Sequence, residues 1–298
     1  MRALVIGGSG QIGGWLLRAL AERCHQAIGT YHTVPQAGLV PLDASRLDEA
    51  ADRLRSARPD VVFYPAGFTW VDGCERDPAR ARDANLHQPL NLARAASEFG
   101  SRFVYFSTDY VFDGGAGPYD EKSPTNPLSA YGRAKRDAER ALADELADRA
   151  LIVRTSWVFG PERQGKNFAY QLVKALGQGK SLDCPSDQVS SPSYGPDVAR
   201  AVVGLVDGGI SGLIHAAGPE VMGRAEFARA IARAFGLDRS LIVAKTTAEL
   251  GQVAPRPLNG GLLTPRLDAI SPGAMRPLAE ALADFRATLS ESEGWAVP

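Results

Sequence analysis

Three side chains in the stretch Phe103–Lys135 have the types and the spacing for acid–base chemistry at a carbonyl group: Thr108, Tyr131 and Lys135. Tyr131 and Lys135 lie in Ala130–Leu146, a segment of good helix formers without proline, so a helix would project both from one face. A neighbouring ammonium favours the phenolate and lowers a tyrosine pKa from its usual value of about 10. Tyr131 could then protonate a carbonyl oxygen as a hydride reaches the carbonyl carbon, while the Thr108 hydroxyl hydrogen-bonds the same oxygen.

The elements that would hold this trio follow from the surrounding sequence. Phe103–Phe106 is an apolar run typical of a buried strand, and Thr108 would stand at the carboxyl end of that strand. Open α/β sheets bind their ligands at this edge. A Tyr-x-x-x-Lys pair alone is more often a pair of surface side chains on a solvated helix, so the trio gains its meaning from these elements.

Composition and charge narrow the class of protein. The chain has 298 residues, 45% hydrophobic and 22% charged, as in ordinary globular proteins. A formal net charge of −1 argues against a nucleic-acid or anionic-membrane partner. The scattered Cys24, Cys74 and Cys184 and the dispersed histidines predict neither disulfides nor a metal site. Because no apolar run reaches the roughly 18 residues of a membrane span, and Ala3–Ile6 is too short for a signal peptide, we expect a cytoplasmic protein.

A glycine-rich turn near the amino terminus indicates a dinucleotide cofactor. The apolar strand Arg2–Ile6 runs into Gly7-x-x-Gly10-x-x-Gly13, and a helical pattern follows over residues 15–23. Gly7 and Gly10 would let backbone N–H groups approach a pyrophosphate, and Gly13 would let the helix pack closely on the strand. The pyrophosphate would lie at a helix N-terminus, where unpaired donors and the helix dipole favour an anion. Glycine turns also end ordinary strands, so the strand–turn–helix order is what favours the cofactor.

The second predicted strand bears on the choice between the nicotinamide cofactors. Gln26–Thr30 is followed by Tyr31 and His32, whereas NAD-preferring sites usually end this strand with a carboxylate that binds the ribose hydroxyls. The lack of a carboxylate near Thr30 favours NADP(H). The lack of an arginine there for the 2′-phosphate leaves NAD(H) open.

Four further positions are candidates for contact with the cofactor. Asp43 would either hydrogen-bond the adenine or cap the predicted helix Arg46–Ser56. Ala66 and Gly67 follow a predicted strand and are small enough to let a ribose approach. Asn85 would either cap the helix that follows it or support Lys135.

The alternation of strands and helices predicts a Rossmann-type, doubly wound parallel α/β sheet. We expect residues 1–160 to form the NAD(P)-binding domain and residues 161–298 a smaller, mainly substrate-binding α/β region, part of which could return to the first sheet. Within it, Pro255–Leu267 reads as a loop whose Arg256 and Asn259 suit recognition of a phosphate or a sugar, or as a solvated loop. The amphipathic stretch Arg224–Phe235 reads as a core helix. The other predicted elements are the strands Leu39–Leu42, Asp60–Pro65, Ala150–Arg154 and Gly212–Ala216 and the helices Pro89–Phe99, Asn167–Leu176 and Pro196–Val206.

Taken together, the motifs resemble those of the extended short-chain dehydrogenase/reductases, and within them the dTDP-4-dehydrorhamnose reductase group. The resemblance covers nearly the whole chain. It rests on GGSGQIG at Gly7–Gly13, VDGCERDPARARDAN at Val71–Asn85, STDYVFDG at Ser107–Gly114, PYDE at Pro118–Glu121, NPLSAYGRAK at Asn126–Lys135, RTSWVFG at Arg154–Gly160 and RPLNGGLLTPRL at Arg256–Leu267.

The resemblance implies NAD(P)H-dependent reduction of a 4-keto group on a nucleotide-activated deoxysugar. Thr108, Tyr131 and Lys135 match the catalytic trio of the family. The other implied site residues are Gln11 and Ile12 in the cofactor motif, the acidic Asp109 beside both the trio and the sugar, Trp157 lining the sugar pocket, and Arg256 and Asn259 in a loop that meets the nucleotide-sugar.

Three positions depart from the family pattern. Asp187–Tyr194 reads DQVSSPSY where the family usually has DQxGxPT, so serines replace the Gly and the Thr. Asn259–Gly260 stands in place of the usual Asn-Ser. Trp15 lies where some members carry a glutamate linked to metal-assisted dimerisation. These departures bear on substrate choice and on assembly, for which a homodimer is open, and leave hydride transfer untouched.

Two alternatives share the fold. A sugar-nucleotide 4,6-dehydratase would carry Asp-Glu after the threonine, but here Asp109 is followed by Tyr110. A non-catalytic, NADP-binding regulatory subunit, as in methionine adenosyltransferase, keeps Tyr-x-x-x-Lys and acts as a binding partner. The intact trio favours the enzyme, and the departures in the substrate loops keep the regulatory subunit open.

Overall fold

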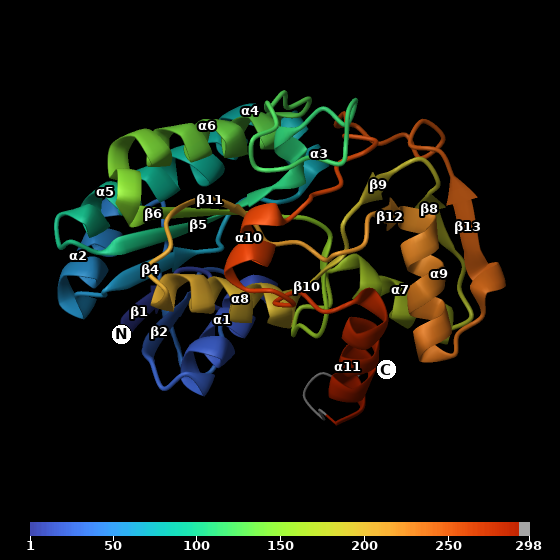
Figure 1. The fold of residues 1–298 in the computed structure, drawn as a ribbon, viewed down its shortest axis with the longest axis horizontal. Helices are drawn as coiled ribbons and strands as arrows, with labels where there is room; N and C mark the ends of the chain where they lie inside the picture. The colour runs from blue at the N-terminus through green and yellow to red at the C-terminus, as the bar shows by residue number, and fades with distance from the viewer. Residues whose placement is uncertain (292–298) are drawn as a thin grey trace.

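A parallel sheet of seven strands forms the centre of the computed structural model, which describes residues 1–291 (Figure 1). The strand order is β11-β6-β5-β4-β1-β2-β3, so the chain winds from β1 first to one edge and then to the other. This is the doubly wound Rossmann-type arrangement, and the predicted fold class is confirmed. The strands are β1 (Arg2–Val5), β2 (Gln26–Tyr31), β3 (Leu39–Pro41), β4 (Val61–Tyr64), β5 (Arg102–Thr108), β6 (Ala150–Thr155) and β11 (Gly212–His215).

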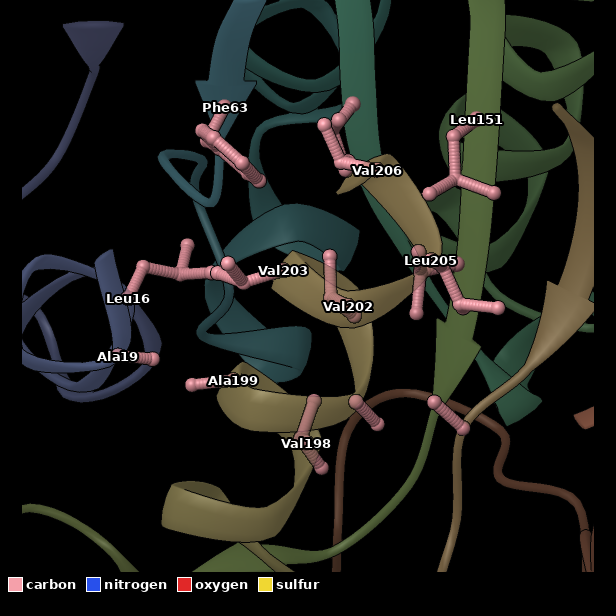
Figure 2. Packing of buried hydrophobic residues seen from close by; sticks show 14 of the residues in the cluster. Leu16, Ala19, Phe63, Leu151, Val198, Ala199, Val202, Val203, Leu205 and Val206 are labelled. Atoms are coloured by element: carbon pink, nitrogen blue, oxygen red, sulfur yellow. The ribbon is translucent and has the colours of Figure 1, made fainter. Parts of the chain in front are cut away.

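Helices cover both faces of this sheet, because alternate residues of each buried strand point to opposite faces. On one face, Val5 and Phe63 belong to a core that includes α1 (Gln11–Glu22) and α8 (Gly195–Asp207). Figure 2 shows side chains of α8 between Leu16 of α1 and the strands. The opposite face is covered by α2 (Leu47–Ala57), α5 (Gln88–Ser97) and α6 (Ala130–Leu146).

The chain after residue 160 forms a smaller α/β region and also contributes to the central sheet. Strand β11 and helix α8 both belong to the central layers. The rest packs around Phe159, Phe227 and Phe285, with the two-stranded sheets β10-β7, β12-β9 and β13-β8 at its borders (Figure 1). Its elements are α7 (Phe168–Gly177), β8 (Leu182–Pro185), β9 (Val189–Ser190), β10 (Ser193–Tyr194), β12 (Met222–Gly223), α9 (Arg224–Phe235), β13 (Ile242–Lys245) and α11 (Leu278–Glu291), together with β7 (Val158–Phe159), which precedes them. Helix α10 (Pro265–Ile270) instead packs on β11, with Leu267 in the core of the central sheet.

Some element boundaries differ from the sequence prediction. The first helix begins at Gln11 rather than at residue 15, so Gly13 lies inside it. The predicted loop Pro255–Leu267 ends early, because α10 begins at Pro265. Proline is favoured at the start of a helix, since its missing N–H is not needed there. The short elements α3 (Val71–Arg76), α4 (Pro78–Arg82) and a π-helical turn (Asp83–His87) were not predicted, because they are too short to show a period.

Two kinds of feature are absent from residues 1–291. None of the helices there has the length and hydropathy that a membrane span needs. Nor do three His, Cys, Asp or Glu side chains gather there closely enough to hold a metal ion. Cys24, Cys74 and Cys184 are free thiols.

Candidate active site

The carboxyl end of β5 carries Thr108, as predicted. The strand lies between β4 and β6, and it is buried from Phe103 onward. The Thr108 hydroxyl donates to Asp109 Oδ1 at 3.0 Å and accepts from the Tyr110 amide at 3.2 Å. It thereby caps the 3₁₀ turn Asp109–Val111, which leads the chain out of the sheet. These two bonds hold the hydroxyl at the edge where this fold class binds ligands.

Helix α6 spans the predicted bounds and rests on the turn that follows β5. The Ser129 hydroxyl accepts from the Gly132 amide at 3.1 Å and caps the helix. A Cβ on Gly132 would lie 2.1 Å from the Tyr110 carbonyl oxygen, so only glycine permits this approach. The close packing brings Tyr131, the second residue of α6, to Thr108.

Tyr131 is buried, and the neighbouring Thr108 side chain acts to lower its pKa. Burial raises the pKa of Tyr131, the negative charges of Asp109 and Cys74 add to this, and the interaction with Thr108 opposes it. The prediction that the pKa of Tyr131 lies below its usual value is therefore wrong for this structure, because burial raises it. Tyr131 is a neutral phenol at neutral pH, which is the form that can donate a proton.

Lys135 lies one helical turn after Tyr131 and is also buried. Its Nζ donates to the Phe106 carbonyl oxygen at 2.8 Å and lies 6.0 Å from the centre of the Tyr131 ring. Burial lowers the pKa of Lys135 to about 7, and Glu139 acts in the opposite direction. The ammonium and the amine thus coexist near neutral pH, and the Nζ keeps donors beyond the one used on Phe106.

The glycine turn has the close packing that a dinucleotide pyrophosphate requires. Gly7 has a φ of 95°, and the Gly10 amide donates to its carbonyl at 3.0 Å. A Cβ on Gly13 would lie 2.1 Å from that same oxygen, so the start of α1 must be glycine. A small pocket opens at the turn, and Gln11 contributes to it a buried Nε2 without a hydrogen-bond partner in residues 1–291. Ile12 packs on the core under α8.

Thr30 and Asp43 have partners within the protein. The Thr30 hydroxyl, 1% exposed, accepts from the Gly7 amide at 3.1 Å and so holds the glycine turn. Asp43 Oδ1 accepts from the amide and the hydroxyl of Ser45 at 3.0 and 2.7 Å. The N-cap of α2 is Arg46, so the interpretation of Asp43 as its cap is wrong: the carboxylate closes a turn before the helix. Contacts of both side chains with a cofactor stay predictions.

Ala66 and Gly67 connect the glycine turn to the reactive trio. A Cβ on Gly7 would lie 3.1 Å from Ala66 Cβ, and one on Gly67 would lie 2.6 Å from Asn85 Oδ1 and 3.7 Å from Lys135 Nζ. Asn85 lies in the π-helical turn, where its Nδ2 donates to two backbone carbonyls and its buried Oδ1 has no partner in residues 1–291. The interpretation of Asn85 as a helix cap is therefore wrong. Its unpaired oxygen faces the same glycine as the Lys135 ammonium.

Asp109 links the trio to the smaller region. Its Oδ2 accepts from the Ser190 hydroxyl at 2.8 Å. Burial raises the pKa of Asp109 to about 6, and the hydrogen bonds from Ser190 and Thr108 lower it. A Cβ on Gly260 would lie 2.8 Å from the same Oδ2, so a side chain at this position would displace the carboxylate.

Trp157 lies where the two regions meet. It has a φ of 41°, and its ring stacks on Phe227 with the ring centres 6.3 Å apart and the ring planes 22° from parallel. The Arg224 guanidinium carbon lies 3.5 Å from the centre of the Trp157 ring. Trp157 is half-buried and is thus packed between α9 and the path from β6 to β7.

The predicted substrate loop reaches the turn after Thr108 through Arg256. Its Nη2 donates to Asp72 Oδ1 at 2.8 Å, and its Nη1 donates to the Tyr110 hydroxyl at 3.0 Å. Asn259 is used differently: its Nδ2 donates to the Gly117 carbonyl at 2.9 Å and so shapes the loop. Arg256 thus lies near the trio, whereas Asn259 acts within the protein.

Sequence reasoning missed three residues of this site. Ser190 was noted only as a departure from a pattern, and Asp72 only as part of a motif. Arg224 was noted only as the first residue of an amphipathic core helix, although an arginine on the first turn of a helix, where the dipole disfavours cations, was a signal.

The parallel sheet, the glycine turn and the buried Thr–Tyr–Lys trio together define an NAD(P)-dependent oxidoreductase of the extended short-chain dehydrogenase/reductase class. Residues 1–291 match the family model described as the RmlD substrate binding domain. The chain therefore belongs to this family, as the sequence motifs predicted.

Known relatives agree with this assignment. The chain is 34% identical to a dTDP-4-dehydrorhamnose reductase of Mycolicibacterium smegmatis, over 95% of this chain and 84% of the relative. It is 33% identical to a probable low-salt glycan biosynthesis reductase of Haloferax volcanii, over 86% of this chain and 88% of the relative. A crystal structure of dTDP-4-dehydrorhamnose reductase from Bacillus anthracis in complex with NADP superposes with a TM-score of 0.88 at 26% identity, covering 96% of this chain and 99% of the other.

Proposed function

We propose that this protein reduces a 4-keto group on a nucleotide-activated deoxysugar and uses NADPH in preference to NADH. The observation that carries the proposal is the burial of Tyr131 at the start of α6, which packs on the turn that follows Thr108 at the carboxyl end of β5. The name of the M. smegmatis relative and the NADP complex of the B. anthracis relative support the choice of substrate class and cofactor.

Tyr131 donates the proton in this mechanism. Burial raises its pKa, so the phenol stays protonated until negative charge develops on the carbonyl oxygen of the substrate. The Thr108 hydroxyl has one proton, so it turns from Asp109 Oδ1 to the same oxygen and stabilises that charge. NADPH, when bound, supplies the hydride.

Lys135 positions the cofactor and tunes Tyr131. With one N–H donated to Phe106, its remaining donors are available to the hydroxyls of the nicotinamide ribose. Its charged form lowers the cost of phenolate formation as the proton leaves Tyr131. Asn85, whose unpaired oxygen faces the same glycine, supports Lys135.

The remaining site residues divide between cofactor and substrate. The cofactor would be held by residues 1–160 and the substrate mainly by residues 161–298, with Asp109 at the boundary between them. We assign the pyrophosphate to the glycine turn, which has room only for backbone. The cofactor side comprises Gly7, Gly10, Gln11, Ile12, Gly13, Thr30, Asp43, Ala66 and Gly67, and the substrate side comprises Asp109, Trp157, Arg256 and Asn259. A cytoplasmic location and a homodimer stay predictions.

Turnover tests the proposal. Purified protein with dTDP-4-dehydro-β-L-rhamnose should consume NADPH, followed by its absorbance, and should consume NADH more slowly. Tyr131→Phe should lower kcat by a factor of about 100 or more with NADPH affinity unchanged, because only the transferable proton is lost. Tyr170→Phe, a buried tyrosine on α7, is the matched control.

Two results would contradict the proposal. An unchanged rate for Tyr131→Phe would remove Tyr131 as the proton donor. Tight NADPH binding without turnover of any 4-keto sugar nucleotide would favour the alternative, a regulatory subunit. The intact trio and the reductase names of the relatives favour the enzyme over that alternative.

A further inference from the structure

Arg224 has a guanidinium group without an acceptor of its own. It is the first residue of α9, half-buried, and its Cζ lies 3.5 Å from the Trp157 ring centre and 4.7 Å from the Phe168 ring centre. Within residues 1–291 its guanidinium makes neither a hydrogen bond nor an ion pair. Aromatic rings cover the flat faces of a guanidinium, but its five N–H donors lie in the plane and need acceptors.

Other arginines that are withdrawn from solvent have such acceptors. Arg154 pairs with Glu139 at 2.6 Å, Arg276 with Asp197 at 2.9 Å, and Arg256 with Asp72 at 2.8 Å. Burial lowers the pKa of Arg224 to about 10, so it is charged at neutral pH. Because Arg224 is half-buried and none of its nitrogens is a buried unpaired atom, its N–H donors are open to an anion that enters from solvent.

The position of Arg224 indicates which ligand that is. Strand β12, which ends at Gly223, pairs with β9, and the Arg224 amide donates to the Gln188 carbonyl at 2.8 Å. Two residues further along β9, Ser190 donates to Asp109, which directly follows Thr108. The charge of Arg224 is close enough to stabilise the Asp109 carboxylate, and it is repelled by Arg256. Arg256 contacts the Tyr110 hydroxyl, and Arg224 follows the strand that pairs with β9, which holds Asp109 through Ser190. Two guanidinium groups are therefore linked to the turn after Thr108, and Asp72 pairs with only one of them.

We infer that Arg224 binds the diphosphate group of the nucleotide-sugar, an inference that rests on the proposed function. A nucleotide-sugar carries its diphosphate on C1, across the six-membered ring from C4. A substrate with C4 at Tyr131 and Thr108 thus presents its anion one ring away, towards the smaller region. Guanidinium groups bind phosphate oxygens with paired, charge-assisted hydrogen bonds. The phosphates of the cofactor belong instead to the turn before α1, in the other part of the molecule (Figure 1).

Calorimetric titration of the full chain with dTDP and with UDP tests this inference without turnover. Arg224→Ala should weaken binding of the nucleoside diphosphate about 10- to 100-fold, as expected for loss of a charge-assisted hydrogen-bond pair. Arg224→Lys should lose less, because it keeps the charge. Thymidine binding and NADPH binding should not change. The matched control is Arg229→Ala, which removes an exposed arginine from the same helix.

The outcomes separate this inference from the proposed function. If Arg224→Ala binds dTDP and UDP as tightly as the wild-type protein does, the inference is overturned. Turnover of a keto-sugar nucleotide by the wild-type protein would still support the proposed function. The inference would also be overturned by an equal loss of thymidine, dTDP and NADPH affinity, which would mark Arg224 as a structural support for Trp157. A wild-type protein that binds neither diphosphate would also overturn it. If Arg224→Ala loses diphosphate binding while the wild-type protein turns over no keto-sugar nucleotide, the inference is supported and the reductase is rejected.

Discussion

Ser190 Oγ lies 2.8 Å from Asp109 Oδ2, and Gly260 lies against the same carboxylate. Ser190 stands where the family usually has glycine, and Gly260 stands where it usually has serine. The Ser190 hydroxyl also lies 3.2 Å from the Gly260 carbonyl oxygen, and a Cβ on Gly260 would lie 2.8 Å from Asp109 Oδ2. The two departures therefore meet at one carboxylate, and we expect each to compensate for the other.

A paired exchange of these residues tests the compensation. Gly260→Ser alone should lower kcat/KM about tenfold or more, because its Cβ crowds a carboxylate that Ser190 already occupies. Adding Ser190→Gly should recover most of the loss, since the hydroxyl then has room and the carboxylate needs a donor. Steady-state kinetics of the two single variants and the double variant give the coupling. Additive losses would show that the two positions act independently.

Asp109 should make the protein less stable as pH rises through about 6. Its folded-state pKa is raised by burial from 3.8 to about 6, so between these values the folded protein holds a proton that the unfolded chain has lost. Its contribution is greatest below the unfolded pKa and is lost as pH rises to the folded one, by about 2–3 kcal/mol in total. Asp109→Asn should remove this part of the pH dependence in urea unfolding.

The matched control for that titration is Asp144→Asn, which removes an exposed carboxylate from α6. It should leave the slope of stability against pH between about 4 and about 7 unchanged. If the free energy of unfolding changes with pH at the same rate in Asp109→Asn and Asp144→Asn, Asp109 does not titrate in this range.

The sequence predicted the helices and strands whose residue pattern continues over many residues or ends at a strong turn signal. Ala130–Leu146 was predicted with the observed bounds, because its helix formers are continuous and Ser129 caps it. The start of α1 was missed, because Gly13 and Gly14 look unfavourable in a helix, and their value lies in contact with the glycine turn rather than in propensity. Helix α10 was missed because Pro265 was read as part of a loop.

The sequence predicted the site residues whose roles follow from residue type and spacing. It did not predict the roles that depend on contacts between segments distant in the sequence. Thr108, Tyr131 and Lys135 stand out by type and spacing. The role of Asn259 in holding Gly117, and the position of Arg224 on Trp157, require the distant segments to be folded together. The raised pKa of Tyr131 was missed for the same reason, since burial cannot be read from a neighbouring lysine.

The pH dependence of kcat/KM should follow the protonation state of Lys135. Burial lowers the pKa of Lys135 to about 7, so its charge is present below that pH and is lost above it. If the ammonium holds the ribose and stabilises the phenolate, kcat/KM should fall as pH rises through about 7 in the free enzyme. Lys135→Arg should move this fall to higher pH, because guanidinium keeps its proton. A profile that stays flat in wild type well above pH 7 would show that the charge is not needed.

Two adjacent glycines of α1 should respond differently to alanine. A Cβ on Gly13 would lie 2.1 Å from the Gly7 carbonyl oxygen, whereas one on Gly14 would lie 3.6 Å from the Gly8 carbonyl oxygen, an ordinary contact. Gly13→Ala should therefore displace the glycine turn, cost about 1–3 kcal/mol of stability and weaken NADPH binding at least about tenfold. Gly14→Ala should stabilise the helix by about 0.5–1 kcal/mol. Urea unfolding and fluorescence titration with NADPH measure both effects. Equal NADPH affinities for the two variants would mean that the contact of Gly13 with Gly7 does not shape the cofactor site.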